Sequence, residues 1–175
     1  MAERIILDAG HGGRDGGAVY GGRLEKEDNL AMTLEVGRIL EEMGFEVVYT
    51  RQEDIYQAPF RKATIANEMG GDLFVSIHRN SSAIPDQYQG VETLIYSMGG
   101  LPERAAENIN RQLEEVGYLN LGIEERPNLI VLNSTRMPAV LIEAGFINSE
   151  IDNQLFDTRF NETADAIATG ISESF

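Results

Sequence analysis

The sequence predicts a single α/β domain in which a mixed, mostly parallel β-sheet is flanked by helices. Two observations support this fold class. Short apolar runs alternate along the chain with segments whose apolar residues recur at helical spacing. The 175 residues suffice for one hydrophobic core and are too few to argue for two domains, and no linker, repeat or low-complexity tract interrupts them. We therefore treat residues 1–175 as one domain.

The expected strands are short apolar runs, and the most continuous of them are typical of strands buried on both faces of a sheet. They comprise residues 4–8, 45–49, 73–77, 91–96, 129–132 and 139–142. The expected helices comprise residues 26–43, residues 59–69, a segment that begins at Pro102, a short helix that starts at the capping pattern Ser149-Glu150-Ile151-Asp152, and a last helix from about Thr158.

The composition excludes several partners and chemistries. A formal net charge of −15 at pH 7 would repel both nucleic acid and anionic membranes, so we expect neither as a partner. Cysteine is absent, so the chain has no disulfide and no thiolate to act as a nucleophile or metal ligand. No apolar run approaches the roughly 18 residues that a membrane span needs. We also expect no signal peptide, because the first four residues lead directly into a strand.

A loop with seven glycines between residues 10 and 22 follows the first expected strand. Such loops often hold phosphate groups, but two details argue against a nucleotide here. The segment Gly10-His11-Gly12-Gly13 lacks the third glycine of the dinucleotide fingerprint, and Arg23-Leu24 stand where a Walker loop needs Lys and Ser or Thr. We therefore expect these glycines to allow sharp turns and a close approach of the backbone to another ligand.

The two histidines of the chain, His11 and His78, each follow an expected buried strand. Ligands of α/β folds collect at that edge of the sheet. A catalytic zinc ion usually has three protein ligands and one open position. The pair therefore indicates a metal site, although either histidine alone would fit an ordinary loop residue. The third ligand has to be a carboxylate, and spacing does not choose among Asp8, Asp15, Glu25, Glu27 and Asp28.

Glu143 is the candidate acid or base of this site, because it directly follows the apolar run 139–142. A carboxylate at such a position is costly to desolvate unless it has a partner or a function. The functional interpretation is a base that activates water at the metal. The structural alternative is an ion pair with an arginine such as Arg136.

Four segments then carry a family resemblance: LDAGHGGRDGGA at 7–18, EKEDNL at 25–30, SIHRN at 76–80 and MPAVLIEAGFIN at 137–148. In order and spacing they resemble the zinc-dependent N-acetylmuramoyl-L-alanine amidases of the Amidase_3 family, which includes autolysins, spore-cortex and mother-cell-wall amidases and phage endolysins. The resemblance covers essentially the whole chain. It implies a twisted six-stranded sheet flanked by helices, which agrees with the six strands expected above.

The resemblance also implies the site and the reaction. His11 and His78 match the two histidine ligands of a zinc ion, and Glu143 matches the catalytic glutamate. Glu25 matches the third ligand, although Glu27 lies close by in the same motif. The implied reaction hydrolyses the amide between the lactyl group of N-acetylmuramic acid and L-alanine in peptidoglycan. The implied setting is extracellular, at the cell wall, for a monomer whose wall-binding domain, if it has one, lies outside these residues.

Three residues are weaker candidates for substrate binding. Asn80 and Asn133 follow expected strand ends, and Arg79 stands where the family commonly has alanine. Arg79 either contacts a carboxylate of the substrate peptide or pairs with one of the many surface acids. Two rival functions also remain: a catalytically inactive wall-binding module with the same fold, and a zinc hydrolase of other specificity, such as a peptidase or a deacetylase. The sequence does not distinguish an autolysin, a phage lysin and a spore-associated enzyme.

Overall fold

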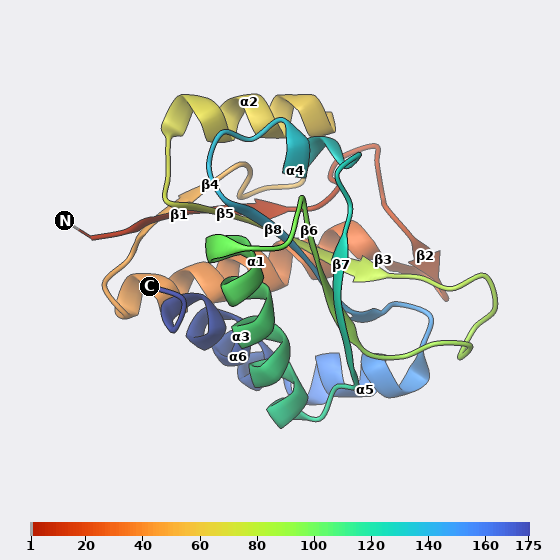
Figure 1. The fold of residues 1–175 in the computed structure, drawn as a ribbon. Helices are drawn as coiled ribbons and strands as arrows, with labels where there is room; N and C mark the ends of the chain where they lie inside the picture. Colours follow the sequence, from red (N-terminus) through yellow and green to blue (C-terminus); the bar gives the residue numbers. More distant parts are fainter. Residues whose placement is uncertain (1) are drawn as a thin grey trace.

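A six-stranded sheet in the order β4-β1-β5-β8-β6-β7 forms the centre of the computed structural model, which describes residues 2–175 (Figure 1). Its strands are β1 (Arg4–Ala9), β4 (Glu46–Tyr49), β5 (Leu73–Asn80), β6 (Val91–Ile95), β7 (Asn120–Glu125) and β8 (Ala139–Phe146). The neighbours β4, β1, β5 and β8 are parallel, whereas β6 runs antiparallel to β8 and parallel to β7. The expected mixed, mostly parallel sheet is confirmed.

Helices cover both faces of this sheet (Figure 1). One face carries α1 (Glu25–Glu42), α3 (Gly100–Val116) and α6 (Phe160–Ser172), which surround the larger apolar core. The other face carries α2 (Pro59–Met69) and the short α4 (Ile130–Asn133), which enclose a smaller core. The helix α5 (Glu150–Thr158) follows β8, and a two-stranded hairpin of β2 (Val19–Tyr20) and β3 (Arg23–Leu24) precedes α1.

Successive side chains of a strand point to opposite faces, and the sequence of β1 uses both. Ile5 and Leu7 pack in the larger core with α1, whereas Ile6 packs in the smaller core with Ala66 of α2. All of these side chains are buried, as expected for a central strand with helices on both sides. The same alternation matters for function, because it decides to which face of the sheet each polar residue near a strand end points.

The expected strand at residues 129–132 is wrong. Ile130–Asn133 form the single helical turn α4, which buries Val131 and Leu132 in the smaller core. A four-residue apolar run does not by itself distinguish a strand from a buried helical turn. The sixth strand is instead β7, an edge strand of sequence NLGIEE whose polar composition gave no apolar run to detect. The hairpin of β2 and β3 was not expected either.

The other elements agree with the sequence to within a few residues. Residues 59–69 form α2 as expected, and the Ser149 side chain caps α5 by accepting a hydrogen bond from the backbone N–H of Asp152 at 3.2 Å. The strands β5 and β8 run further than expected, so that His78 and Glu143 lie within them. In the portion described, none of the helices combines the length and apolar character needed to cross a bilayer.

Candidate metal centre

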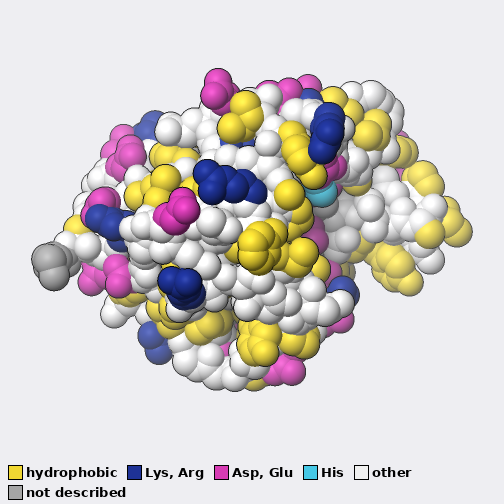
Figure 2. All heavy atoms as spheres, turned by 90° about the horizontal axis from the view of Figure 1, so that it is seen from above, with side chains coloured by type: hydrophobic (Ala, Val, Ile, Leu, Met, Phe, Trp, Pro, Cys, Tyr) yellow, Lys and Arg dark blue, Asp and Glu magenta, His cyan; other side chains and the backbone are white. Residues whose placement is uncertain are grey.

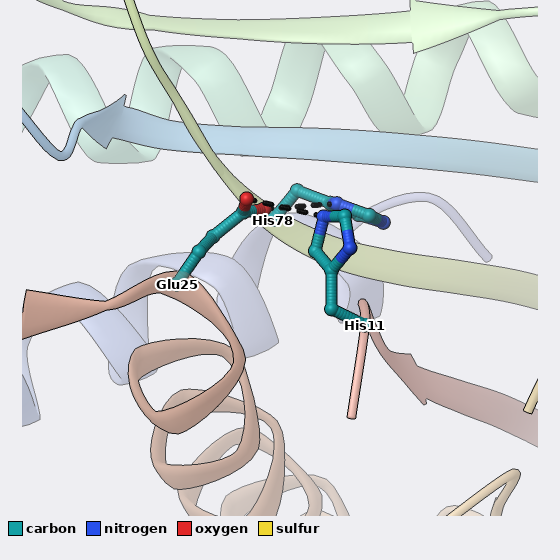
Figure 3. A group of neighbouring side chains, drawn as sticks. All are labelled: His11, Glu25 and His78. Atoms are coloured by element: carbon teal, nitrogen blue, oxygen red, sulfur yellow. Dashed lines mark hydrogen bonds and ion pairs between the residues drawn. The ribbon is translucent and has the colours of Figure 1, made fainter. Parts of the chain in front are cut away.

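The two histidines and Glu25 meet at the edge of the sheet where the parallel strands end. His11 follows β1, His78 lies near the end of β5, and Glu25 is the first residue of α1. Figure 3 shows the two imidazoles and the carboxylate pointing toward one another from these three elements. One ligand atom from each residue can be chosen so that all three lie within 4.8 Å of one another. This spacing is close enough for the three residues to share a metal ion.

Glycines make this approach possible. A Cβ atom on Gly10 would lie only 2.3 Å from Cε1 of His78, and one on Gly17 would lie 2.5 Å from Oε2 of Glu25. The backbone at His11 also adopts a left-handed conformation, with φ of 61°. The glycine-rich loop therefore packs closely against the His11, Glu25 and His78 side chains.

The carboxylate of Glu25 lies between the two imidazoles. Its Oε2 is 3.1 Å from Nε2 of His11, and its Oε1 is 3.1 Å from Nδ1 of His78. Asn29, one turn later in α1, donates a hydrogen bond to Oε1 at 3.2 Å. Burial raises the pKa of Glu25, but the hydrogen bonds and positive charge of the two histidines outweigh it and hold the pKa far below its usual range. Glu25 therefore carries its negative charge at neutral pH.

Asp15 holds His11 from the other side of the ring. Its Oδ2 lies 2.8 Å from Nδ1 of His11, so the Nε2 atom faces Glu25. A carboxylate on the far nitrogen is a common way of orienting a metal-binding imidazole. Burial lowers the pKa of His11, but Glu25 and Asp15 together raise it to about 9. Asp15 is one of the five carboxylates that the sequence offers as a third ligand, and the structure places it as the hydrogen-bond partner of His11.

The remaining carboxylates considered for the third ligand lie elsewhere. Asp8 is fully buried and accepts hydrogen bonds from Lys62 at 2.8 Å and from two hydroxyl groups. Asp28 pairs with arginine side chains, and Glu27 is exposed. Glu25 is thus the candidate carboxylate that the fold brings to both histidines.

Glu143 lies beside this cluster. It is the Cα partner of His78 across the parallel pair β5 and β8, so their side chains share a face of the sheet. Its Oε2 is buried and has no hydrogen-bond partner within residues 2–175. Burial raises the pKa of Glu143 to about 7, opposed by the charge of His78 and supported by that of Glu25. The alternative ion pair with Arg136 is not formed in the described part of the chain, where Arg136 is an exposed residue before β8.

A pocket of about 300 Å³ opens next to the two histidines. Figure 2 shows a histidine side chain in a hollow of the surface with hydrophobic side chains around it. His11 and His78 line the pocket together with Asp8 and Lys62. An apolar wall faces them, and it consists of Pro59, Leu129, Ile130, Val131 and Leu141. The pocket thus combines a polar side, which includes two of the ligand candidates, with a side suited to alkyl groups.

The three weaker substrate-binding candidates lie in different surroundings. Asn80 donates a hydrogen bond to Oε1 of Glu92 at 2.9 Å. Asn133 is exposed at the end of α4 and does not line the pocket beside the histidines. Arg79 is only 2% exposed and pairs with Asp28 at 2.8 Å. The expectation that Arg79 reaches outward to the substrate is therefore wrong, and its alternative, a pair with an acid, is what the structure shows.

Fold and site together define the class of this protein: an α/β domain with a candidate His–Glu–His metal centre at the carboxyl edge of a mostly parallel sheet. The family model described as N-acetylmuramoyl-L-alanine amidase, Amidase_3, matches residues 5–173. The chain belongs to this family. It is an N-acetylmuramoyl-L-alanine amidase, and its activity is cell-wall hydrolysis.

Individual relatives agree with this assignment. The chain is similar to the endolysin of Bacillus phage SPP1, with 34% identity over 99% of this chain and 66% of the endolysin. It is also similar to the sporulation-specific N-acetylmuramoyl-L-alanine amidase of Bacillus subtilis, with 33% identity over 98% of this chain and 68% of that protein. The crystal structure of an N-acetylmuramoyl-L-alanine amidase from Clostridium difficile superposes with a TM-score of 0.91 at 28% identity, covering 98% of this chain and 96% of that one. The chain thus spans about two thirds of the two curated relatives.

Proposed function

We propose that His11, Glu25 and His78 hold a zinc ion and that Glu143 is the acid and base of amide hydrolysis. The observation that supports this most strongly is the convergence of the three ligand atoms within 4.8 Å, beside a buried glutamate oxygen that has no partner in the described chain. Two imidazoles and one carboxylate are a donor set of catalytic zinc sites that keep a fourth position open. Zinc in such a site lowers the pKa of water and polarises a carbonyl oxygen.

The residues around the three ligands also fit a metal. Glu25 supplies a full negative charge between the imidazoles, and Asp15 fixes the orientation of His11. Metal ligands must be deprotonated, so zinc would replace the proton that Glu25 and Asp15 hold on His11. The same negative charges that raise the pKa of His11 would favour a divalent cation in its place.

Glu143 performs the proton transfers in this proposal. Its free Oε2 accepts a proton from the water that attacks the carbonyl carbon. The same oxygen then delivers the proton to the amide nitrogen of L-alanine as the C–N bond breaks. Burial raises the pKa of Glu143, and a carboxyl group raised in this way can accept and release a proton near neutral pH. The apolar wall of the pocket is suited to the methyl groups of the lactyl and alanine units on either side of the bond.

The substrate in this proposal is peptidoglycan, and the place of action is the cell wall outside the cytoplasm. The family assignment and the phage endolysin and sporulation amidase among the relatives support this setting. We also propose that the chain acts as a monomer, because one chain supplies all three ligands and the base. The net charge of −15 continues to argue against nucleic acid and anionic membranes as partners.

Digestion of purified peptidoglycan tests the proposed chemistry. The wild type should release peptides with a new L-alanine amino terminus and leave the glycan strands uncut. Glu143→Gln protein and chelator-treated wild type should release almost none, whereas Glu27→Gln, an exposed acid near the site, should behave as wild type. Cleavage within the peptide or release of acetate would identify a hydrolase of other specificity. Binding to the wall without any cleavage by zinc-loaded wild type would identify an inactive binding module.

A further inference from the structure

Arg79 is a cation buried directly behind the candidate metal centre. It follows His78 in β5, and its side chain therefore lies on the opposite face of the sheet. Burying a guanidinium group is costly, and hydrogen bonds to its N–H groups offset part of that cost. Here Nη1 donates to Oδ2 of Asp28 at 2.8 Å, and Nη2 donates to Oδ1 of Asn153 at 2.9 Å. The Phe156 ring also lies 4.3 Å from the guanidinium carbon.

These contacts join α1 and β5, which carry the ligand candidates Glu25 and His78. Asp28 lies in α1 three residues after Glu25, on the next turn of the same helix. The backbone N–H of Arg79 itself donates to Oε1 of Glu25 at 3.2 Å. Arg79 thus holds the start of α1 against β5 at two points, one through its side chain and one through its backbone. The distance from Glu25 to His78 depends on this junction.

We propose that Arg79 is a positioning residue that fixes Glu25 relative to His78 and thereby sets the affinity of the site for zinc. The inference rests on the proposed function, because it assigns a task to Arg79 only if these residues hold a metal. Arg79 is a buried cation that ties the helix of Glu25 to the strand of His78.

Arg23 provides a natural comparison with Arg79. Its Nε contacts the same Oδ2 of Asp28 at 2.6 Å, and its guanidinium forms two hydrogen bonds with Asp157 of α5, at 2.7 and 2.9 Å. Arg23 lies in the hairpin strand β3, so its ion pairs connect the hairpin with α1 and α5. They do not connect α1 with β5. The two arginines therefore share one carboxylate, but only Arg79 links the elements of two ligand candidates.

The test is the zinc dissociation constant of the whole chain, measured by competition with a chromogenic chelator at a temperature where circular dichroism shows the protein folded. Arg79→Met should weaken zinc binding about 10–100-fold, as changes behind metal ligands commonly do. Arg79→Lys keeps the charge but loses the planar fork, so it should restore part of the affinity. Arg23→Met is the control, because it removes a different ion pair with Asp28. It should change the zinc affinity by less than about threefold, whereas a residue directly behind the ligands should have the larger effect.

The outcomes separate the possible roles of Arg79. Arg79→Met protein that binds zinc as tightly as wild type, whether or not it melts earlier, would show that the residue serves stability alone. Asp28→Asn tests the same junction from the α1 side and should weaken zinc binding more than Arg23→Met, even if Arg79→Met does not fold. Wild type that binds no zinc would instead overturn the proposed function, and with it this role of Arg79.

Discussion

The two faces of the central sheet differ in what their side chains do. The face under α1, α3 and α6 buries a continuous apolar cluster, which contains 26 buried residues among residues 2–175. The face under α2 and α4 buries only eight such residues in its cluster. That second face also carries the pocket, the buried pair of Asp8 with Lys62, and the side chains of His78 and Glu143 near the ends of β5 and β8. Burial of apolar area, and with it most of the stability, is therefore concentrated on the first face.

Neighbouring residues of one strand serve these two faces. In β5, Ile77 packs in the larger core while His78 points to the opposite side, and in β8, Ile142 and Glu143 divide in the same way. A rigid core on one face can thus hold functional groups on the other with little freedom to move. The comparison predicts that substitutions in the apolar core of the first face lower stability, whereas substitutions beside the pocket change the chemistry. Arg79 is the exception, because it lies on the first face directly behind the ligand candidates.

The largest effect should come from Glu143→Gln, which removes the base while keeping its shape. The rate of amide cleavage should fall by about 10²–10⁴-fold, the usual contribution of a general acid or base. Stability should stay the same or rise, because a buried carboxyl oxygen without a described partner is replaced by a neutral group. The measurements are the rate of L-alanine amino-terminus formation and the thermal unfolding midpoint. A variant that unfolds much earlier than wild type would contradict the separation of the faces.

On the other face, Leu113→Ala should have the opposite pattern. Leu113 lies in α3 and is fully buried in the larger core. Its truncation should therefore lower the free energy of unfolding by about 2–5 kcal/mol. Urea unfolding measures this loss. At a temperature where the variant is folded, its zinc affinity and its cleavage rate per folded molecule should match those of wild type. A tenfold weaker zinc affinity in the folded variant would show that the two faces are coupled.

Gly10→Ala tests the tight junction at the edge of the chemical face. The added Cβ would lie 2.3 Å from the His78 ring, so the imidazole has to move. A displacement of about 1 Å at a catalytic site can cost about 100-fold in rate, and we expect a loss of that order. Gly16→Ala is the matched control in the same loop, because its Cβ would be 3.7 Å from its nearest neighbour. Equal activity of the two variants would contradict the positioning of His78 by this glycine.

The smallest effect concerns pH and the metal-free protein. Burial lowers the pKa of His11, yet Glu25 and Asp15 raise it above its ordinary 6.5 to about 9. A raised histidine pKa stabilises the folded state fully below about pH 6.5, and this stabilisation is lost as the pH rises through about 9. Because the ring is partly exposed, we expect a loss of only about 1 kcal/mol. Urea unfolding at pH 6 and pH 9.5 measures it.

Zinc-loaded protein is the control for this pH effect, because the metal takes the place of the proton on His11. Its stability should not fall over the same interval. A metal-free protein whose stability rises between pH 6 and pH 9.5 would show that the charges of Glu25 and Asp15 do not act on His11 as described.

The sequence predicts the fold well where one residue pattern corresponds to one structure. The continuous apolar runs of β1, β5 and β8 indicate central strands, and the Ser149 cap marks the start of α5. The prediction fails at α4, where four apolar residues fit a strand and a buried helical turn equally well. It also misses β7, because an edge strand with polar residues on its exposed side carries no apolar run.

In the candidate site, too, the sequence determines some residues and leaves others open. Because His11 and His78 each follow an apolar run, the sequence alone indicates that they belong to one site. The choice of Glu25 as the third ligand needs the family resemblance or the structure. Spacing could not choose because the first turn of α1 carries three acids, and only the fold shows which one faces the histidines. The surroundings of Arg79 could not be read either, since its partner Asp28 lies 51 residues away in the chain.

A zinc titration of metal-free enzyme tests the central claim most directly. New L-alanine amino termini are counted while zinc is added to wild type, Glu25→Gln and Glu27→Gln protein that has been stripped with a chelator. Wild type and Glu27→Gln should regain amide cleavage up to one zinc per chain, and Glu25→Gln should not regain it at that ratio. Full cleavage by stripped wild type, or equal recovery by Glu25→Gln, would contradict a zinc centre built from His11, Glu25 and His78.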